Sequence, residues 1–204
     1  MVKFKNIISC IYMKIYLFGL SKIYKFDPWH ASAPYACRQY KREVVDLINE
    51  VDSTFAIEVG CGLADILSRA KSLEKYGVDA DRGVVNACKK IYGRRIKFLN
   101  NNLTDLAKGV VEIRPSNLNR GVLIIINWPH SEHIDILRTN IFQIKNRIPF
   151  EYLVMDGIRR GVDGYKYSHE IDAVSTIGKI IKVVPSSDNV RDLYLVKVDS
   201  NILL

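Results

Sequence analysis

The chain has 204 residues, of which 48% are hydrophobic and 25% are charged. These proportions are typical of an ordinary globular protein, and they exclude a disordered or fibrous chain. A chain of this length can bury a core that is stable without cross-links, which excludes a minimal disulfide scaffold. We therefore expect one main domain.

The cysteines give a first indication of the compartment. There are four, and none forms a C-x-x-C pair: Cys10, Cys37, Cys61 and Cys88. The C-x-x-C spacing, which this chain lacks, is typical of zinc sites and of redox-active pairs. We therefore expect reduced thiols, no metal and a cytoplasmic protein.

Positive charge is concentrated at the N-terminal end. The whole chain has a formal net charge of +8. Residues 1–42 hold eight lysines and arginines against one aspartate, a balance of +7, so the other 162 residues carry only +1. A nucleic-acid-binding domain would carry basic residues across a face of its folded body. The distribution disfavours nucleic acid, and any anionic partner should contact the N-terminal segment.

That segment, residues 1–35, is predicted to be a basic arm that also contributes a lid, and residues 36–204 to be the domain. Lys3, Lys14 and Lys25 recur every eleven residues, which favours an amphipathic helix from residue 3 to residue 26. Such a helix would lie on an anionic membrane surface, as a peripheral contact, or pack on its own domain or a partner subunit.

The same segment is neither a membrane span nor a signal peptide by its pattern. Its longest uncharged runs, residues 6–13 and 15–21, fall far short of the ~18 or more apolar residues that a span needs. The small residues 31–33 resemble a cleavage site, but Lys22 and Lys25 lie between them and the apolar stretch.

Beyond the arm, short apolar runs alternate with amphipathic ones. In chain order the predicted elements are a helix at Lys41–Glu50, a strand at Thr54–Val59, a helix at Leu63–Lys71, a strand at Glu74–Val78, a helix at Val84–Ile91, strands at Ile96–Leu99 and Val122–Ile126, a helix at Ile134–Lys145, a strand at Tyr152–Met155, a helix near His169–Thr176, and strands at Ile180–Val184 and Leu193–Val198. Continuous apolar strands between helices predict an α/β fold with a mostly parallel sheet covered on both faces. The last two strands have no helix between them, so the final strand should be antiparallel.

The turn after the first strand is the most informative segment. It reads Glu58-Val59-Gly60-Cys61-Gly62-Leu63-Ala64. Glycines there let the main chain approach a ligand, and the small Ala64 would let a following helix pack closely. Asp79 ends the second strand and is followed by Ala80, at a position where a carboxylate can accept both hydroxyl protons of a ribose. Together these features predict a nucleoside-binding site.

These residues resemble the motifs of the class I S-adenosylmethionine-dependent methyltransferases. Glu58-x-Gly60-x-Gly62-x-Ala64 is similar to the first motif, and Gly77-Val78-Asp79 to the second. The resemblance implies a Rossmann-like three-layer sandwich with seven strands, and S-adenosyl-L-methionine as cofactor. It also implies a cofactor-binding set in which Glu58 faces the methionine end and Asp79 holds the ribose, together with Gly60, Cys61, Gly62 and Ala80.

The third motif of that family is matched less well. Residues 96–103 resemble it, and there an acidic residue commonly receives the adenine amino group. This chain offers Asn102 at that position, or Asp105 three residues later. The resemblance therefore implies Asn102 as an adenine contact, with Asp105 as the alternative.

Two other classes remain as alternatives. An NAD-dependent enzyme uses the same glycine turn and ribose carboxylate, but here Asp65 occupies the position of the third glycine and would repel a pyrophosphate. A non-catalytic cofactor-binding or partner-binding subunit with the same fold is the second alternative.

Acceptor chemistry is expected at the end of the fourth strand. Asn127-Trp128-Pro129-His130 matches three of four positions of the Asn-Pro-Pro-Tyr-like motif of amino-methylating members. Asn127 and His130 are the predicted catalytic residues, the latter as a general base. His130 and His133, with only Asp135 nearby, fall short of a metal site. Further candidates are Asp156 in the acceptor pocket, Trp29, His30, Tyr35 and Arg38 in the lid, and Tyr165, Tyr167 and His169 near the pocket.

The sequence thus predicts a methyltransferase that transfers a methyl group to an O or N atom of a small molecule. A sugar or a sugar-linked carrier near a membrane is one such acceptor. Without a large target-recognition domain, and with a body that is nearly neutral, DNA and RNA are disfavoured as acceptors.

Overall fold

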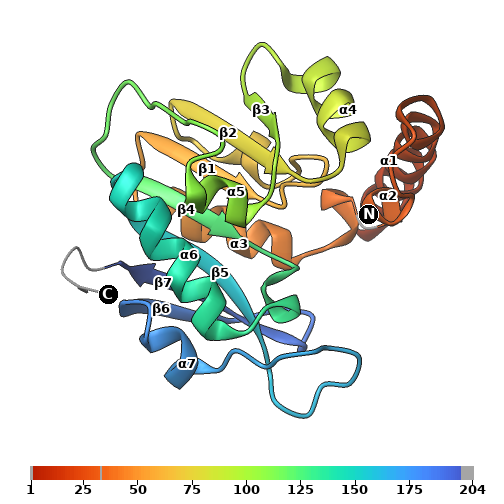
Figure 1. Cartoon of the computed structure of the whole chain (residues 1–204). Helices are drawn as coiled ribbons and strands as arrows, with labels where there is room; N and C mark the ends of the chain where they lie inside the picture. Colours follow the sequence, from red (N-terminus) through yellow and green to blue (C-terminus); the bar gives the residue numbers. More distant parts are fainter. Residues whose placement is uncertain (1, 33, 199–204) are drawn as a thin grey trace.

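The computed structural model describes residues 2–32 and 34–198 (Figure 1). Its centre is a single sheet of seven strands, in the spatial order β3-β2-β1-β4-β5-β7-β6. The strands are β1 (Phe55–Val59), β2 (Glu74–Asp79), β3 (Lys97–Asn100), β4 (Gly121–Ile125), β5 (Phe150–Ile158), β6 (Lys179–Pro185) and β7 (Arg191–Lys197).

The direction of the strands confirms the predicted topology. β1 pairs in parallel with β2 and β4, and the parallel pairing continues from β2 to β3 and from β4 to β5. β7 runs antiparallel to both β5 and β6. The last strand of the chain is therefore the antiparallel one, inserted between two strands that point the other way.

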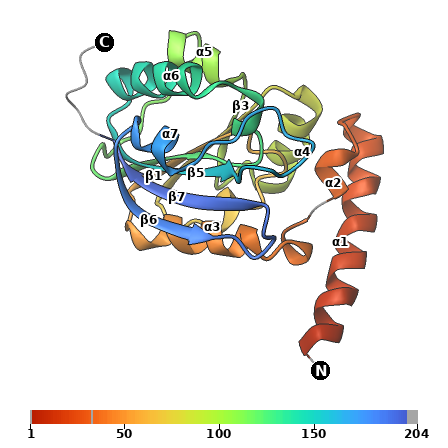
Figure 2. The same cartoon turned by 90° about the horizontal axis from the view of Figure 1, so that it is seen from below.

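Helices cover both faces of the sheet (Figures 1 and 2). On one face, a hydrophobic cluster joins the strands to α3 (Tyr40–Glu50) and α4 (Arg82–Tyr92). On the opposite face, a second cluster joins the strands to α5 (Leu103–Lys108), α6 (Ile134–Arg147) and α7 (Ile171–Ser175). β1 and β4 are buried along their whole length because adjacent residues contribute to opposite clusters. This confirms the three-layer sandwich.

The N-terminal helices lie at the side of the domain. α1 (Val2–Tyr24) stands next to α2 (Trp29–Ser32) and α4, and in Figure 2 its N-terminal end projects beyond the layers. Among the described residues, no helix combines the length and the apolar character that crossing a bilayer requires.

One predicted helix is wrong. The segment Leu63–Lys71 forms only a single 3-10 turn, Leu67–Arg69. Gly62 and Ala64 have φ angles of +49° and +55°, so the chain is left-handed where the helix was expected to begin. Two expectations depended on this helix and are therefore wrong. Ala64 does not pack a helix closely on the strand, and Asp65 does not lie on the first turn of a helix.

The helices α2 and α5 were not predicted, and for α5 the sequence carries a signal. α5 begins with a capping box in which the Asn102 side chain accepts from the Asp105 amide and the Asp105 carboxylate accepts from the Asn102 amide. Its left-handed C-cap is Gly109, with φ +73°.

The prediction that all four cysteines are reduced is wrong for two of them. Cys10 of α1 and Cys37 of the 3-10 turn Tyr35–Cys37 form a disulfide, with their Cα atoms 5.4 Å apart. Cys61 and Cys88 are free and buried. Sequence spacing could not show that α1 packs beside this turn. Disulfides persist in oxidising compartments, so the cytoplasmic prediction loses its argument from the cysteines.

Candidate functional site

Two cavities lie where the sheet changes direction of winding. β1 and β4 are neighbours in space but are not consecutive strands, and the loops after both open at the same edge. Such a switch point is where open α/β sheets bind ligands. The larger cavity measures about 610 Å³ and the smaller about 280 Å³, and four residues line both: Trp29, His30, Gly60 and Trp128.

The glycine loop after β1 needs its glycine at residue 60. Gly60 has a φ angle of +69°, and a Cβ atom there would overlap the indole of Trp128, coming within 2.5 Å of Cδ1. The amides of Gly60 and Cys61 donate to the carbonyl of Val78 on β2, at 2.8 and 3.1 Å. The loop is thereby held against the second strand while its outer side faces both cavities.

Asp79, at the end of β2, is buried and lines the larger cavity. Its Oδ2 accepts a hydrogen bond from the Gly62 amide at 2.8 Å, and its Oδ1 accepts from the Asp81 amide at 2.9 Å. A carboxylate has about four acceptor positions. Each oxygen of Asp79 thus retains acceptor capacity toward the cavity, and the same group fixes the glycine loop.

The residues expected around adenine divide between the cavity and the fold. Ala80 and Asn102 line the larger cavity, as do Asn101 and Leu103. The capping box occupies the side-chain oxygen of Asn102, and Asp105 does not line that cavity.

Glu58 is a buried carboxyl group on β1 that lines the smaller cavity. Its Oε2 accepts from the Leu67 amide at 3.1 Å. Burial raises its pKa to about 8, so the group holds its proton at neutral pH. Lys41 and Asp65, which pair at 2.9 Å, line the same cavity.

A polar network around Asn127 forms one end of the smaller cavity. The Asn127 Oδ1 accepts from the Tyr40 hydroxyl at 2.7 Å and from the Arg191 Nη1 at 2.8 Å. Because arginine can only donate, this contact fixes which end of the Asn127 amide is the oxygen. Asp156 accepts from the backbone N–H of Asn127 at 3.0 Å and from the Arg191 Nη1 at 2.5 Å. Burial raises the pKa of Asp156, although the charge of Arg191 opposes this.

Sequence reasoning missed Tyr40 and Arg191 as members of this network. They come from α3 and from the last strand, so they are 151 positions apart in the numbering. Neither belongs to a motif, and no sequence signal links them to Asn127. The structure brings Asn127 and Asp156 together, but Asp156, which was expected in the acceptor pocket, lines neither cavity.

Trp128 is the wall between the two cavities. Its indole Nε1 donates to the Val59 carbonyl at 2.7 Å, which fixes the ring over the glycine loop. This is the position at which the chain departs from the Asn-Pro-Pro-Tyr-like pattern, and the large side chain lies where both cavities meet.

The histidines are not arranged as expected. His130 lines neither cavity and packs edge-on against Tyr165, which lines the smaller one, with ring centroids 4.7 Å apart. His30 lines both, stacks on Trp29 at 4.0 Å, and has its pKa lowered by burial against the opposing effect of nearby aspartates. His169 is buried and bonds to the Pro129 carbonyl, while His133 caps α6.

The lid candidates also divide. Trp29, His30 and Arg38 line the smaller cavity, whereas Tyr35 stacks against the Arg69 guanidinium outside it. Tyr167 lines neither cavity. Within residues 2–32 and 34–198, no cluster of three or more His, Cys, Asp or Glu side chains is arranged to hold a metal ion.

Comparisons with known proteins agree on the fold. No protein-family model matches the chain, and no curated protein does either. Among solved structures, the chain is similar to magnesium protoporphyrin IX methyltransferase from Synechocystis with bound S-adenosylmethionine, at 12% identity and a TM-score of 0.61, covering 96% of this chain and 97% of that one.

Two further structures extend the comparison. The N-methyltransferase NodS from Bradyrhizobium japonicum, in complex with S-adenosyl-L-homocysteine, is 14% identical with a TM-score of 0.62, over 89% of this chain and 97% of that one. A mitomycin 7-O-methyltransferase is 12% identical with a TM-score of 0.58, over 88% and 60%. The chain therefore has the Rossmann-like, seven-stranded fold of the class I S-adenosylmethionine-dependent methyltransferases, as its motifs predicted.

Proposed function

We propose that the chain is an S-adenosylmethionine-dependent methyltransferase. The observation that carries the proposal is the placement of Asp79, whose carboxylate faces the larger cavity while it holds the glycine loop through the Gly62 amide at 2.8 Å. A buried carboxylate with free acceptor positions next to a loop of exposed backbone suits a ribose. The solved structures with this fold that hold the cofactor or its product support the assignment.

The residues present fit this cofactor in two parts. The larger cavity, with Asp79, Ala80 and Asn102, would hold the adenosine. The smaller cavity offers Glu58 and Asp65 to a cationic ammonium, and Lys41 and Arg38 to a carboxylate. The bound cofactor would supply an activated methyl group on a positively charged sulfur. A pyrophosphate, which an NAD-dependent enzyme must bind, would instead meet the Asp65 carboxylate in the smaller cavity.

The acceptor would enter the smaller cavity beside Trp128 and be methylated on an O or N atom. Most of the catalysis would come from holding this atom in line with the methyl group, at about 3 to 3.5 Å. Asn127 would orient the acceptor, with its oxygen already fixed by Tyr40 and Arg191 and its amide nitrogen left as a donor. The acceptor would share the smaller cavity, about 280 Å³, with the methionine end of the cofactor, which suits a small molecule, including a sugar, better than a polymer.

A hydroxyl acceptor would need a base to remove its proton. His130 was the predicted base, yet it reaches the cavity only through Tyr165. His30 lines both cavities, and its lowered pKa keeps the ring neutral and able to take a proton. We propose His30 as the base for a hydroxyl acceptor, with His130 as the alternative, while an amine would need no strong base.

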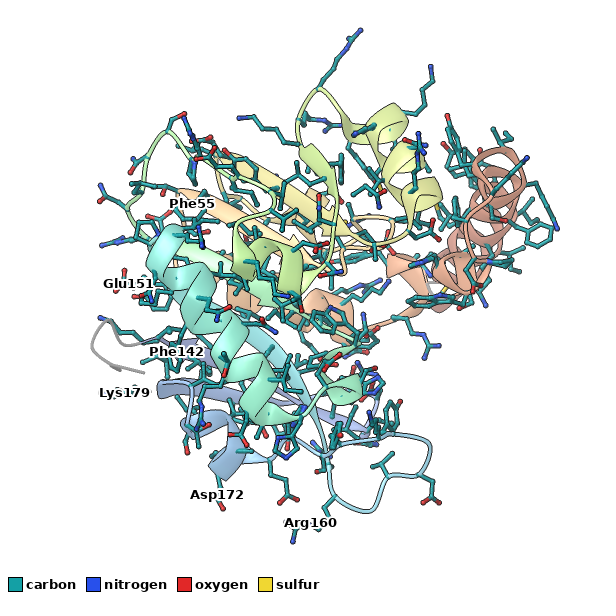
Figure 3. All side chains as sticks on the ribbon, in the orientation of Figure 1. Phe55, Phe142, Glu151, Arg160, Asp172 and Lys179 are labelled. Carbon is teal, nitrogen blue, oxygen red and sulfur yellow. A yellow bond between two sulfur atoms is a disulfide. The ribbon has the colours of Figure 1, made fainter. Side chains whose placement is uncertain are left out.

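Calorimetric titration with S-adenosylmethionine tests the proposal. Asp79→Ala should weaken binding about ten- to a hundred-fold, because it removes charge-assisted hydrogen bonds of about 1.5–3 kcal/mol. Asp79→Asn, which keeps one acceptor oxygen for the Gly62 amide, should lose less. The matched control is Asp172→Ala, since Asp172 is exposed on α7 and points away from the domain (Figure 3).

The outcomes separate the three classes of function. Equal affinity in the wild type and Asp79→Ala would refute the ribose assignment, and binding of NAD alone would favour the dinucleotide alternative. Incubation with methyl donor and a panel of amines, alcohols and sugars, followed by mass spectrometry, then reports transfer. Tight cofactor binding without transfer to any acceptor would favour a non-catalytic subunit.

A further inference from the structure

The outward face of α1 is apolar although it is exposed to solvent. We define this face by six side chains that are between 44% and 70% exposed: Ile11, Tyr12, Ile15, Tyr16, Phe18 and Ile23. At helical spacing they fall on one side of the helix, and the exposed Lys22 lies among them. Trp29 on α2 is 60% exposed and lies beyond the end of α1. Exposed apolar strips of this kind mark surfaces that another body covers.

The opposite face of α1 is already satisfied by its own domain. Leu17 and Ser21 are buried, and Leu20 and Tyr24 pack against the main hydrophobic cluster. The Cys10–Cys37 disulfide fixes the helix to the domain from the same side. Packing on the domain, one of the two interpretations of the arm, therefore accounts for the inward face and leaves the outward face without an occupant.

The charges of α1 indicate what covers it. The helix contains Lys3, Lys5, Lys14 and Lys22 and no acidic residue, and Lys25 follows it. Lys14 and Lys22 are exposed, and the Lys22 Nζ lies 4.9 Å from the centre of the Phe18 ring. Lysines whose stems run along apolar rings can bury these stems and keep their ammonium groups at the level of phosphate groups.

A second copy of the chain fits this face poorly. In a two-fold symmetric dimer the same surface meets itself, so the lysines of α1 would face lysines with no carboxylate on the helix to pair with them. A membrane surface with anionic headgroups provides both an apolar interior for the isoleucines and aromatics and a negative surface for the lysines.

We propose that α1 is a membrane-docking helix, which lies flat in the headgroup region of an anionic bilayer with its outward face down. The docked surface would continue toward the site. A groove of about 430 Å³ runs between α1 and α2, lined by Lys14, Ile15, Phe18, Pro28, Ala31 and Ser32. Trp29, which directly follows Pro28 and begins α2, lines both cavities of the candidate site. Docking would therefore hold the opening of these cavities close to the lipid.

Flotation of the full-length, oxidised chain with vesicles tests this proposal directly. Vesicles of equal parts phosphatidylcholine and phosphatidylglycerol should carry the protein, vesicles of phosphatidylcholine alone should carry much less, and added salt should weaken the binding. Lys14→Glu with Lys22→Glu should reduce binding roughly tenfold or more. Ile11→Gln, Ile15→Gln and Ile23→Gln together should abolish it, with glutamine chosen because it preserves the helix.

The control reverses two charges far from α1. Lys108→Glu with Lys179→Glu should bind like the wild type, since Lys108 is on α5 and Figure 3 shows Lys179 on the side of the molecule opposite α1. An unchanged thermal transition in every variant shows that binding, and not folding, has changed. Equal loss in the control pair, or no flotation of the wild type, would overturn the proposal. So would a wild-type dimer in light scattering that the glutamine substitutions dissociate, because the second copy would then be the occupant.

Discussion

Two ion pairs link the end of β5 to β7. They provide a test of the polar network that Arg191 and Asp156 form with Asn127. Arg191 pairs with Asp156 at 2.5 Å, with side chains only 10% and 1% exposed. Arg159 pairs with Asp192 at 2.6 Å, with side chains 33% and 26% exposed. Both pairs bridge the end of β5 and β7, with Arg159 directly following β5. Arg191 is the more buried arginine, and it also binds Asn127 and Asp188.

Replacing each arginine with methionine removes the charge and keeps a similar side-chain length. Arg191→Met leaves the Asp156 carboxylate buried without its counter-charge, and breaking a buried pair in this way costs about 3–5 kcal/mol. Arg159→Met removes a pair that water screens, and we expect a loss of about 0.2–1 kcal/mol. The difference should appear in the midpoints of urea unfolding curves at neutral pH.

The pH dependence identifies Asp156 as the cause. Burial already raises the pKa of Asp156 in the wild type, and removing Arg191 should raise it further. As the pH falls, the Asp156 carboxylate of the Arg191→Met variant takes up a proton, and it is then no longer a buried charge. The deficit of Arg191→Met relative to the wild type should therefore shrink in acid, and Asp156→Asn in the same chain should recover stability at neutral pH.

The reasoning fails if the two arginine variants lose equal stability. It also fails if the deficit of Arg191→Met is independent of pH, or if Asp156→Asn gives no recovery, since the loss would then come from packing of the arginine stem.

Two further predictions concern the glycine loop and its neighbour. Burial raises the pKa of Glu58 from 4.5 to about 8, so between these values the native state holds a proton that the unfolded chain releases, and the free energy of unfolding should fall as the pH rises through this window. Glu58→Gln should flatten that slope in urea unfolding measured across the window, and an unchanged slope would contradict the assignment. Gly60→Ala should abolish detectable S-adenosylmethionine binding in calorimetry, because its Cβ would overlap the Trp128 indole. The control is Gly161→Ala, because Gly161 also has a positive φ angle, +82°, but has open space around it. This variant shares the backbone strain and should keep the affinity for S-adenosylmethionine. Equal loss in both variants would show that the clash with Trp128 is irrelevant.

The sequence predicted best what depends on local pattern. The apolar runs of β1 and β4, buried at every residue, gave a sheet covered on both faces, and the missing helix between the last two strands gave the antiparallel β7. The position of Asp79 beside the larger cavity could be predicted because its place at the end of a strand, after a glycine turn, is itself a sequence pattern.

What could not be predicted depends on contacts between distant segments. The helix expected at Leu63–Lys71 had suitable residues, but the left-handed Gly62 and Ala64 prevent it from starting there. Arg191 reaches Asn127 only because β7 inserts beside β5. The sequence favoured His130 as the base and gave His30 only as a lid residue, because the path of the N-terminal segment across the cavities could not be foreseen.

The disulfide between Cys10 and Cys37 closes a covalent ring, and α2 lies inside that ring. Trp29 and His30, which line both cavities, are thus carried on a segment that is tied to the domain at both ends. While the bond is intact, this segment can open only as far as the closed ring allows. Reduction would open the ring, and the segment would then be held to the domain by non-covalent packing alone, such as that of the buried Leu17, Phe26 and Ala31.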